Sequence, residues 1–498
     1  MVKSDNRSGM ATPFRFFKLS NILIAALFIL WTVGCFWFFQ NNFKYHFFFI
    51  EQNQLFLSTP DCLAAYFGKP AWLACMAGDW AQQFYHFKLA GPAVLTLSLL
   101  IFGIFAFLSL RECIPAKANR FLRDWCPAIA ALALMTVEAR LFFYENARLA
   151  SLYALGGGVI LWYVYHRITE DLSGRRWAGI IINSVICIAV AAVCYILFGY
   201  GALAFLALEL LSSPAGKRIP AGAVISIALA FGLSGNVCTH YRMERKDALL
   251  VPGPGRWVDA KKARGVEDLL TYSIEYGRGN YKGIINLYEH SRNAKTPEMS
   301  FFYSASAAQL GILPDKLLKM KKPNLGTFIH LDSKSNLFTI EMAAELYFLI
   351  GDMTYTERAC MHANNFSPTK RCACLIKRLA EANLIIGDYE GAEKYLRQLR
   401  SSFIYRKWAE DHTPGSFSED VQRKIDHKRQ FLNNANEIRI GDNCHTILTG
   451  LLDANKDNII ALDYLLCTDI IANQKGMFMR DYEKYGPRDC ELYNRIVK

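Results

Sequence analysis

The chain has 498 residues, of which 52% are hydrophobic and 20% are charged, and its formal net charge is +12. This length predicts two or three domains. The basic residues form no stripe interleaved with aromatic side chains, which excludes a nucleic-acid-binding surface. The 14 cysteines lack zinc-finger spacing, so we expect no metal, and no motif indicates another cofactor.

Hydropathy divides the chain into two parts. Repeated apolar runs fill residues 19–240, whereas residues 250–498 mix charged and apolar residues in ordinary proportion. We therefore expect an all-α protein with a transmembrane domain followed by a soluble domain. Residues 1–18 form a basic leader. The first apolar run ends without a small-residue cleavage site, so we expect it to remain in the protein as an uncleaved span.

A helix needs about 20 apolar residues to cross a bilayer. Seven stretches are candidates for such crossings, and the fifth and sixth are the doubtful pair. The candidates are Leu19–Gln40, Ala90–Leu110, Trp125–Phe143, Ala150–Tyr165, Ala178–Leu197, Gly199–Leu211 and Ala221–Val237. Residues 178–211 would overrun a bilayer as one helix, so we expect a break at Gly199–Tyr200–Gly201.

Basic residues favour a cytoplasmic N-terminus. With seven crossings, the segments on the N-terminal side hold 13 Lys and Arg residues, and the exterior segments before the last crossing hold four. This asymmetry predicts that loop 41–89 and the C-terminal domain lie on the outer face, which would be the periplasm for an inner-membrane protein of a Gram-negative bacterium. Arg242, Arg245 and Lys246 oppose this prediction, and a single crossing through 178–211 would place the C-terminal domain in the cytoplasm.

The soluble half contains a repeated local pattern. Its three copies are RGNYKGIINLYEH from Arg278, IGDMTYTERACMH from Ile350 and IGDYEGAEKYLRQ from Ile386. In each copy Gly is followed by Asp or Asn and then by an amphipathic helix. Gly351 and Gly387 are 36 residues apart, near the roughly 34-residue period of tetratricopeptide repeats. We expect an α-solenoid of helical hairpins that loses regularity after Pro414, an architecture that typically binds a protein segment.

Loop 41–89 is long and rich in aromatic residues, which predicts two helices in the membrane interface, over 55–67 and 71–86. Its opening stretch, HFFFIEQNQLFL, places four polar residues between apolar blocks. The loop supplies five candidate site residues. The acidic candidates for catalysis are Glu51, Asp61 and Asp79, and the binding candidates are Gln52 and Gln54.

Ionisable residues near a membrane interior often mark function. Four of them near the third predicted span are further binding candidates: Glu138, Arg140, Glu145 and Arg148. The spacing of Glu138, Glu145 and Arg148 is compatible with one helical face. The alternative is that these side chains reach the interface and form local ion pairs.

Two groups of cysteines are candidates for other roles. Cys360, His362, Cys372 and Cys374 could in principle ligate zinc, but residues two apart on a helix point in different directions, so we expect three buried packing cysteines and a surface histidine instead. Cys62 and Cys75 both lie in the predicted exterior loop, where a disulfide is chemically permitted. Reduced packing cysteines are an equally good interpretation.

Three stretches resemble a known family. EMAAELYFLIG, KRCACLIKRLAEANLIIGDYEGAEKYLRQLRSSFIYRKWAED and EQNQLFLSTPDCLAAYFGKPAWL are similar to multi-pass membrane proteins from Bacteroidetes that are catalogued as a domain of unknown function. The resemblance covers nearly the whole chain. It implies membrane helices followed by a repeat-like helical domain, and it implies no activity.

Three functions are consistent with these features, and the least favoured, a transporter or channel-like component, would need broken helices with several buried charges. The preferred one is an envelope protein, anchored in the lipid bilayer, whose exterior helical domain binds or scaffolds a protein partner. The alternative follows from a resemblance to multi-pass glycosyltransferases that use a polyprenyl-linked substrate. By that resemblance Glu51 is an acid/base or a metal ligand, with Asp61 and Asp79 as further candidates. Those enzymes usually have more spans and a paired acidic motif that Glu51–Gln52 does not reproduce.

Overall fold

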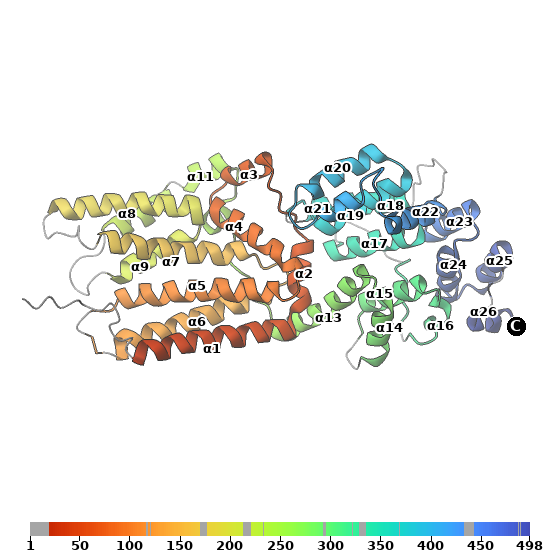
Figure 1. Cartoon of the computed structure of the whole chain (residues 1–498), viewed down its shortest axis with the longest axis horizontal. Helices are drawn as coiled ribbons and strands as arrows, with labels where there is room; N and C mark the ends of the chain where they lie inside the picture. The colour runs from red at the N-terminus through yellow and green to blue at the C-terminus, as the bar shows by residue number, and fades with distance from the viewer. Residues whose placement is uncertain are drawn as a thin grey trace, which may run out of the picture.

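The computed structural model of the protein describes residues 19–115, 118–119, 121–169, 177–212, 221–232, 234–291, 295–320, 322–327, 335–367, 369–432, 443–486, 488 and 490–498. All regular elements in these ranges are helices, which confirms the all-α prediction. They form an N-terminal bundle and a C-terminal helical domain that follow one another along the longest axis (Figure 1). The predicted leader, residues 1–18, lies outside the described residues.

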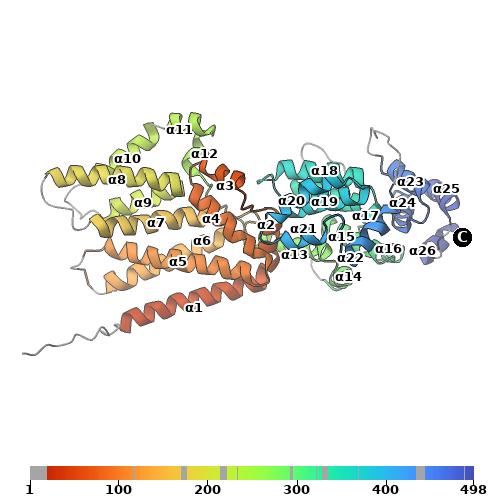
Figure 2. The ribbon, with the colours of Figure 1, turned by 45° about the horizontal axis from the view of Figure 1, so that its top comes forward.

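The N-terminal bundle is made of helices, most of which lie side by side along this axis (Figures 1 and 2). They are α1 (Leu19–Asn42), α5 (Ala90–Glu112), α6 (Cys126–Leu141), α7 (Leu149–Thr169), α8 (Trp177–Phe198), α9 (Gly201–Ser212), α10 (Ala221–Gly232) and α11 (Ser234–Tyr241). Four of them, α1, α5, α7 and α8, are long and apolar enough to cross a membrane. Apolar side chains such as Leu30, Ile101 and Ile181 are exposed on the outer faces of α1, α5 and α8, as expected for helices that contact lipid.

The bundle has shorter helices at three of the seven predicted crossings. The α6 helix has 16 residues and follows a five-residue π-helical turn, η2 (Phe121–Trp125), while α9 has 12 residues. A fifth crossing would come from α10 and α11, whose stretches Ala221–Ala230 and Gly235–Tyr241 meet at 55°. The predicted break between α8 and α9 is present, at Gly199 and Tyr200. Gly199 takes φ +57°, a conformation that glycine adopts without strain.

The α7 helix is packed against α9 through small residues. A Cβ atom on Gly158 would lie 2.0 Å from the carbonyl oxygen of Gly201, and a Cβ on Gly201 would lie 1.9 Å from that of Ala154. Ala154 and Gly158 are four residues apart and therefore on one face of α7. Small residues at this spacing let two helix backbones approach closely.

Short helices cover the end of the bundle that faces the C-terminal domain. They are α2 (Lys44–Gln52), α3 (Pro60–Phe67), α4 (Trp72–Gln82), the 3-10 helix η1 (Gln83–His86) and α12 (Arg245–Leu250). Helices α3 and α4 are separated near Gly68–Lys69–Pro70, as predicted. The first predicted helix nevertheless begins at Pro60 instead of residue 55, because residues 54–58 have no regular helical structure. The α4 helix packs on α7, where a Cβ on Gly78 would meet the backbone of Ala150.

The C-terminal domain is built from helices alone in its described residues. They are α13 (Ala260–Gly277), α14 (Tyr281–His290), α15 (Pro297–Gln309), α16 (Leu313–Leu317), α17 (Leu337–Ile350), α18 (Met353–Phe366), α19 (Ala373–Ile386), α20 (Tyr389–Arg400), α21 (Arg406–Asp411), α22 (Glu419–Arg429), α23 (Cys444–Ala454), α24 (Ile459–Ile471), α25 (Lys475–Tyr485) and α26 (Glu491–Val497). From α17 to α20 each helix packs extensively on the next. Beyond α20 the packing is less regular.

The turns of the α17–α20 stack explain the repeated sequence pattern. Gly351 and Gly387 end α17 and α19 with φ of 101° and 93°, where a side chain would be strained. The next residues begin the following helices: the carboxylate of Asp352 accepts from Tyr355 N, and that of Asp388 accepts from Gly391 N. Each Gly-Asp pair therefore ends one helix and caps the next.

The C-terminal domain has two hydrophobic cores. One is formed by α13–α16 together with α23–α26 and part of α17. The other is formed by α17–α22 and includes Leu55 and Leu57, which belong to the loop assigned by sequence to the transmembrane domain. Two residues of the loop within the predicted 19–240 domain therefore pack in the core of the predicted 250–498 domain.

Candidate functional site

The α2 helix connects the bundle to the C-terminal domain, and its first turn is capped from outside the helix. Glu267 of α13 accepts hydrogen bonds from the backbone N–H groups of Tyr45 (2.7 Å) and His46 (3.0 Å). The first N–H groups of a helix have no partner within the helix, and a carboxylate there also interacts favourably with the helix dipole. Glu267 is buried, so its side chain binds α13 to α2 away from water.

The buried position of Glu267 predicts a pH dependence of stability. Burial raises the pKa of Glu267 to about 7, although the two backbone hydrogen bonds oppose this shift. The folded protein therefore holds a proton between pH ~4.3 and 7 that the unfolded chain lacks. This proton stabilises the folded protein fully below pH ~4.3, and the stabilisation is lost as the pH rises through 7. In that range the free energy of unfolding falls by up to about 1.4 kcal/mol per pH unit.

We expect the unfolding midpoint of the purified protein to fall between pH 5 and pH 8 more steeply than that of Glu267→Gln. Thermal unfolding followed by tryptophan fluorescence at several pH values measures this difference. Glu410→Gln, at an exposed position of α21, is the matched control and should retain the wild-type slope. Equal slopes for the wild type and Glu267→Gln would contradict the prediction.

The last turn of α2 carries Glu51, which is only 2% exposed. The hydroxyl of Tyr405, between α20 and α21, donates to Glu51 Oε1 at 2.5 Å. The amide of Gln52 donates to Glu51 Oε2 at 2.6 Å and also lies 2.6 Å from the Tyr405 hydroxyl. His86 Nδ1 lies 3.4 Å from Glu51 Oε2. Glu51 and Gln52 therefore form a polar cluster with Tyr405 of the C-terminal domain and His86 of η1.

Residues 53–57 extend from this cluster into the C-terminal domain. The Thr369 hydroxyl donates to the carbonyl oxygen of Asn53 at 3.2 Å. Leu55 and Leu57 enter the core of α17–α22, while the ring of Phe56 lies 6.4 Å from that of Tyr66 on α3. Alternate side chains of an extended segment point to opposite sides, so this short stretch contacts both domains.

Asp79 forms a separate ion pair at the end of the bundle. Arg148 Nη2 donates to Asp79 Oδ1 at 3.1 Å, and the Tyr66 hydroxyl donates to Asp79 Oδ2 at 2.9 Å. The Gln54 amide lies 3.5 Å from the backbone carbonyl oxygen of Asp79. The structure thus brings three predicted residues together, with Asp79 neutralised by Arg148.

The remaining candidates lie apart. Asp61 is exposed in the first turn of α3, where its negative charge interacts favourably with the positive end of the helix dipole. The predicted single face for Glu138, Glu145 and Arg148 is wrong, because α6 ends at Leu141 and the chain turns before Glu145. The Arg140 guanidinium lies over two aromatic rings, 4.0 Å from the centroid of Phe143 and 4.8 Å from that of Trp257.

The cysteines are free thiols that are buried or partly buried in the structure. All 14 are free, so Cys62 and Cys75 form no disulfide in the structure. The Cys372 thiol lies 3.5 Å from the carbonyl oxygen of Asn53. Burial raises the pKa of Cys372 to about 12, which keeps the thiol protonated and unreactive at neutral pH.

A cavity of about 250 Å³ lies beside the Glu51 cluster, between α2, α13, α17 and α19. Its polar lining includes Gln52, Asn53, His86, Arg278, Glu341 and Lys377. Glu341 Oε1 is buried without a hydrogen-bond partner. Burial, together with Glu345, raises the pKa of Glu341 to about 8, so this carboxyl group is largely protonated at neutral pH and offers a hydrogen-bond donor.

His86 is the lining residue best suited to proton transfer. Its Nδ1 faces the Glu51 carboxylate, an arrangement that favours a proton on Nδ1 and leaves Nε2 as an acceptor. A buried carboxylate that orients an imidazole in this way is the arrangement general-base histidines use. Glu51 itself does not line the cavity, so it would position His86 instead of contacting a ligand.

Sequence reasoning missed His86, Tyr405 and Glu267. His86 is 35 residues from Glu51, and Tyr405 is 354 residues from it. The polar quartet in an apolar stretch indicated that partners were needed, but no local pattern identified them.

Residues 18–495 match the model of DUF6057, described as a family of unknown function. The chain belongs to this family. This result confirms the resemblance to an uncharacterised family that the sequence indicated. No curated protein and no solved structure matches the chain. The DUF6057 match covers both domains and the junction between them.

Proposed function

We propose that this DUF6057 protein is a membrane-anchored binding platform, in which the C-terminal helical domain is held at the membrane surface and binds a protein partner. The junction supports this proposal most directly. Buried contacts at the junction determine how the C-terminal domain is oriented on the bundle. They are the contacts of Glu51 with Tyr405, of Glu267 with the start of α2, and of Leu55 and Leu57 with the C-terminal core.

The proposal includes seven crossings of a Bacteroidetes inner membrane and a periplasmic C-terminal domain. In this arrangement α6, α9 and the bent pair α10–α11 cross in addition to the four long helices. The C-terminal domain lies at the end of the bundle where α1 gives way to α2 (Figure 1). An N-terminus in the cytoplasm, favoured by the basic segments, then places this domain outside.

The partner-binding part of the proposal rests on the α17–α20 stack. We interpret its Gly-Asp turns and consecutive packing as tetratricopeptide-like, and such stacks commonly hold a segment of another protein. Large apolar side chains remain exposed in this part of the domain, among them Met361, Phe366 and Phe403. Exposed aromatic residues are enriched where proteins bind each other.

Photo-crosslinking in native membranes tests the platform. Phe366, 65% exposed at the end of α18, is replaced by a photoreactive phenylalanine analogue, and the control carries the analogue at Ile181 on the exposed face of α8. We expect one discrete protein adduct from position 366 and lipid adducts alone from position 181. Absence of a protein adduct at 366, or the same adduct at both positions, would contradict the proposal.

A second candidate function is a transferase that acts on a polyprenyl-linked substrate. The observation in its favour is the cavity at the membrane-facing junction, where His86 is backed by Glu51 and where Arg278 and Lys377 could neutralise a phosphate. In this candidate His86 accepts a proton, and Glu51 holds the imidazole. Native mass spectrometry of the purified protein separates the two candidates, since only the transferase requires a retained polyprenyl phosphate.

A further inference from the structure

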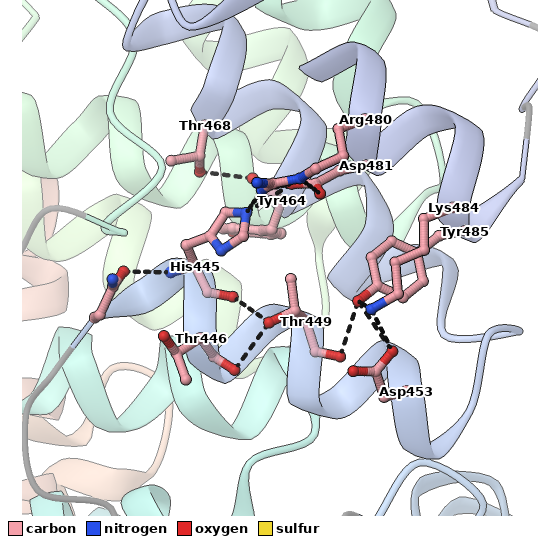
Figure 3. A network of polar contacts seen from close by, with 11 residues as sticks. His445, Thr446, Thr449, Asp453, Tyr464, Thr468, Arg480, Asp481, Lys484 and Tyr485 are labelled. Atoms are coloured by element: carbon pink, nitrogen blue, oxygen red, sulfur yellow. Dashed lines mark hydrogen bonds and ion pairs between the residues drawn. The ribbon is translucent and has the colours of Figure 1, made fainter. Parts of the chain in front are cut away.

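Three potential metal ligands meet at the far end of the C-terminal domain, away from the junction. His445 lies in the first turn of α23, Asp469 near the end of α24, and Asp481 in the middle of α25. One ligand atom of each residue lies within 4.8 Å of the other two. Figure 3 shows His445 and Asp481 meeting beside the guanidinium group of Arg480.

The polar contacts within this group leave one carboxylate oxygen unsatisfied. His445 Nε2 lies 2.6 Å from Asp481 Oδ2, and Arg480 Nε donates to Asp481 Oδ1 at 3.0 Å. Asp469 is only 2% exposed, and its Oδ2 is buried without a hydrogen-bond partner. A buried carboxylate oxygen without a partner is costly, so this oxygen indicates that the group binds a ligand.

The imidazole nitrogen of His445 has conflicting neighbours. Besides the acceptor Asp481 Oδ2, it has the donor Arg480 Nη2 at 3.3 Å. If Nε2 carries a proton, two hydrogen-bond donors face each other, Nε2–H and the Arg480 N–H. If Nε2 carries a lone pair, two acceptors face each other, Nε2 and the Asp481 carboxylate. A cation bound between Nε2 and the two carboxylates would satisfy the lone pair and both negative charges together.

We propose that His445, Asp469 and Asp481 bind a divalent transition-metal cation such as Zn²⁺ and thereby tie α23, α24 and α25 together. One imidazole and two carboxylates are a donor set that such ions accept. Ligand distances of about 2.0–2.2 Å set neighbouring donors roughly 3.4 Å apart in a tetrahedral site. The cation would therefore replace the short His445–Asp481 hydrogen bond with two metal bonds.

Arg480 competes with the cation for Asp481. Its side chain is 60% exposed, so it can turn into solvent when a metal binds, and its charge partly compensates the two carboxylates when none is bound. The metal would act as a structural clamp, because all three ligands come from helices of one packed unit.

Zinc titration of the full chain tests this site. The untagged protein in detergent is stripped with EDTA and titrated with ZnCl₂ by calorimetry. We expect one ion per chain, at least a 100-fold loss of affinity in Asp469→Asn, and unchanged binding in Asp453→Asn. Asp453 is an exposed carboxylate of α23 that pairs with Lys484, so it controls for nonspecific binding to acidic residues.

Two further results decide the matter even if a ligand variant fails to fold. Arg480→Gln should bind Zn²⁺ at least as tightly as the wild type, because the competing charge is gone, and EDTA should lower the melting temperature of the wild type. Failure of the wild type to take up Zn²⁺, equal affinities in Asp469→Asn and Asp453→Asn, or weaker binding in Arg480→Gln would overturn the proposal.

Discussion

Glu51→Ala is expected to destabilise the two-domain protein by about 2–4 kcal/mol, because it leaves the Tyr405 hydroxyl and the Gln52 amide without their buried acceptor. The C-terminal domain should then detach locally from α2. Limited proteolysis should cut within residues 54–59 earlier than in the wild type, and the unfolding midpoint should fall in a thermal melt.

Asp61→Ala is the matched control for this experiment, because Asp61 is an acidic residue of the same loop but is exposed on α3. It should keep the wild-type cleavage pattern. Tyr405→Phe removes the hydroxyl but retains the ring, so we expect a smaller loss of about 1 kcal/mol. If Glu51→Ala and Asp61→Ala melt and are cleaved alike, the Glu51 cluster does not hold the domains together.

Gly201→Ala should have a still larger effect, more than about 4 kcal/mol, because the added Cβ would lie 1.9 Å from the carbonyl oxygen of Ala154. The obstructing atom belongs to the α7 backbone, so no rotamer change can relieve the contact. Helices α7 and α9 would have to separate, which opens the centre of the bundle. The yield of monodisperse protein in size-exclusion chromatography and the melting temperature of that fraction measure this effect.

Gly34→Ala in α1 is the control, since a Cβ at Gly34 meets nothing within 4 Å. In a helix this substitution is expected to be neutral or slightly stabilising. Wild-type yield and melting temperature for Gly201→Ala would show that α7 and α9 do not approach as closely as the structure indicates.

The hydrogen bonds of Glu51 change the interpretation of this residue. The resemblance to glycosyltransferases predicted an acidic residue facing a substrate at the membrane surface. In the structure both carboxylate oxygens of Glu51 accept hydrogen bonds from protein groups, and His86 stands between Glu51 and the cavity. A test of catalysis should therefore substitute residues that line the cavity, because a loss of activity in Glu51→Ala would also follow from a displaced domain.

The sequence predicted the long helices well because their signal is local. The predicted spans Ala90–Leu110 and Ala178–Leu197 differ by at most two residues at either end from α5 and α8. Apolar length and the absence of charge determine such helices in any tertiary context. The break near Gly199 and the turns at Gly351 and Gly387 were predictable for the same reason, since glycine in these sequence settings ends helices wherever they pack.

Sequence by itself thus determined the helical class, the apolar N-terminal half and the repeated turns, all of which depend on neighbouring residues. Only the tertiary structure decided that Leu55 and Leu57 enter the C-terminal core, that Glu51 meets Tyr405, and that Asp79 pairs with Arg148. A buried polar side chain must find a partner, but the partner can come from any part of the chain that folding brings near. The stretch HFFFIEQNQLFL therefore shows that partners are required, and the packing of the two domains selects them.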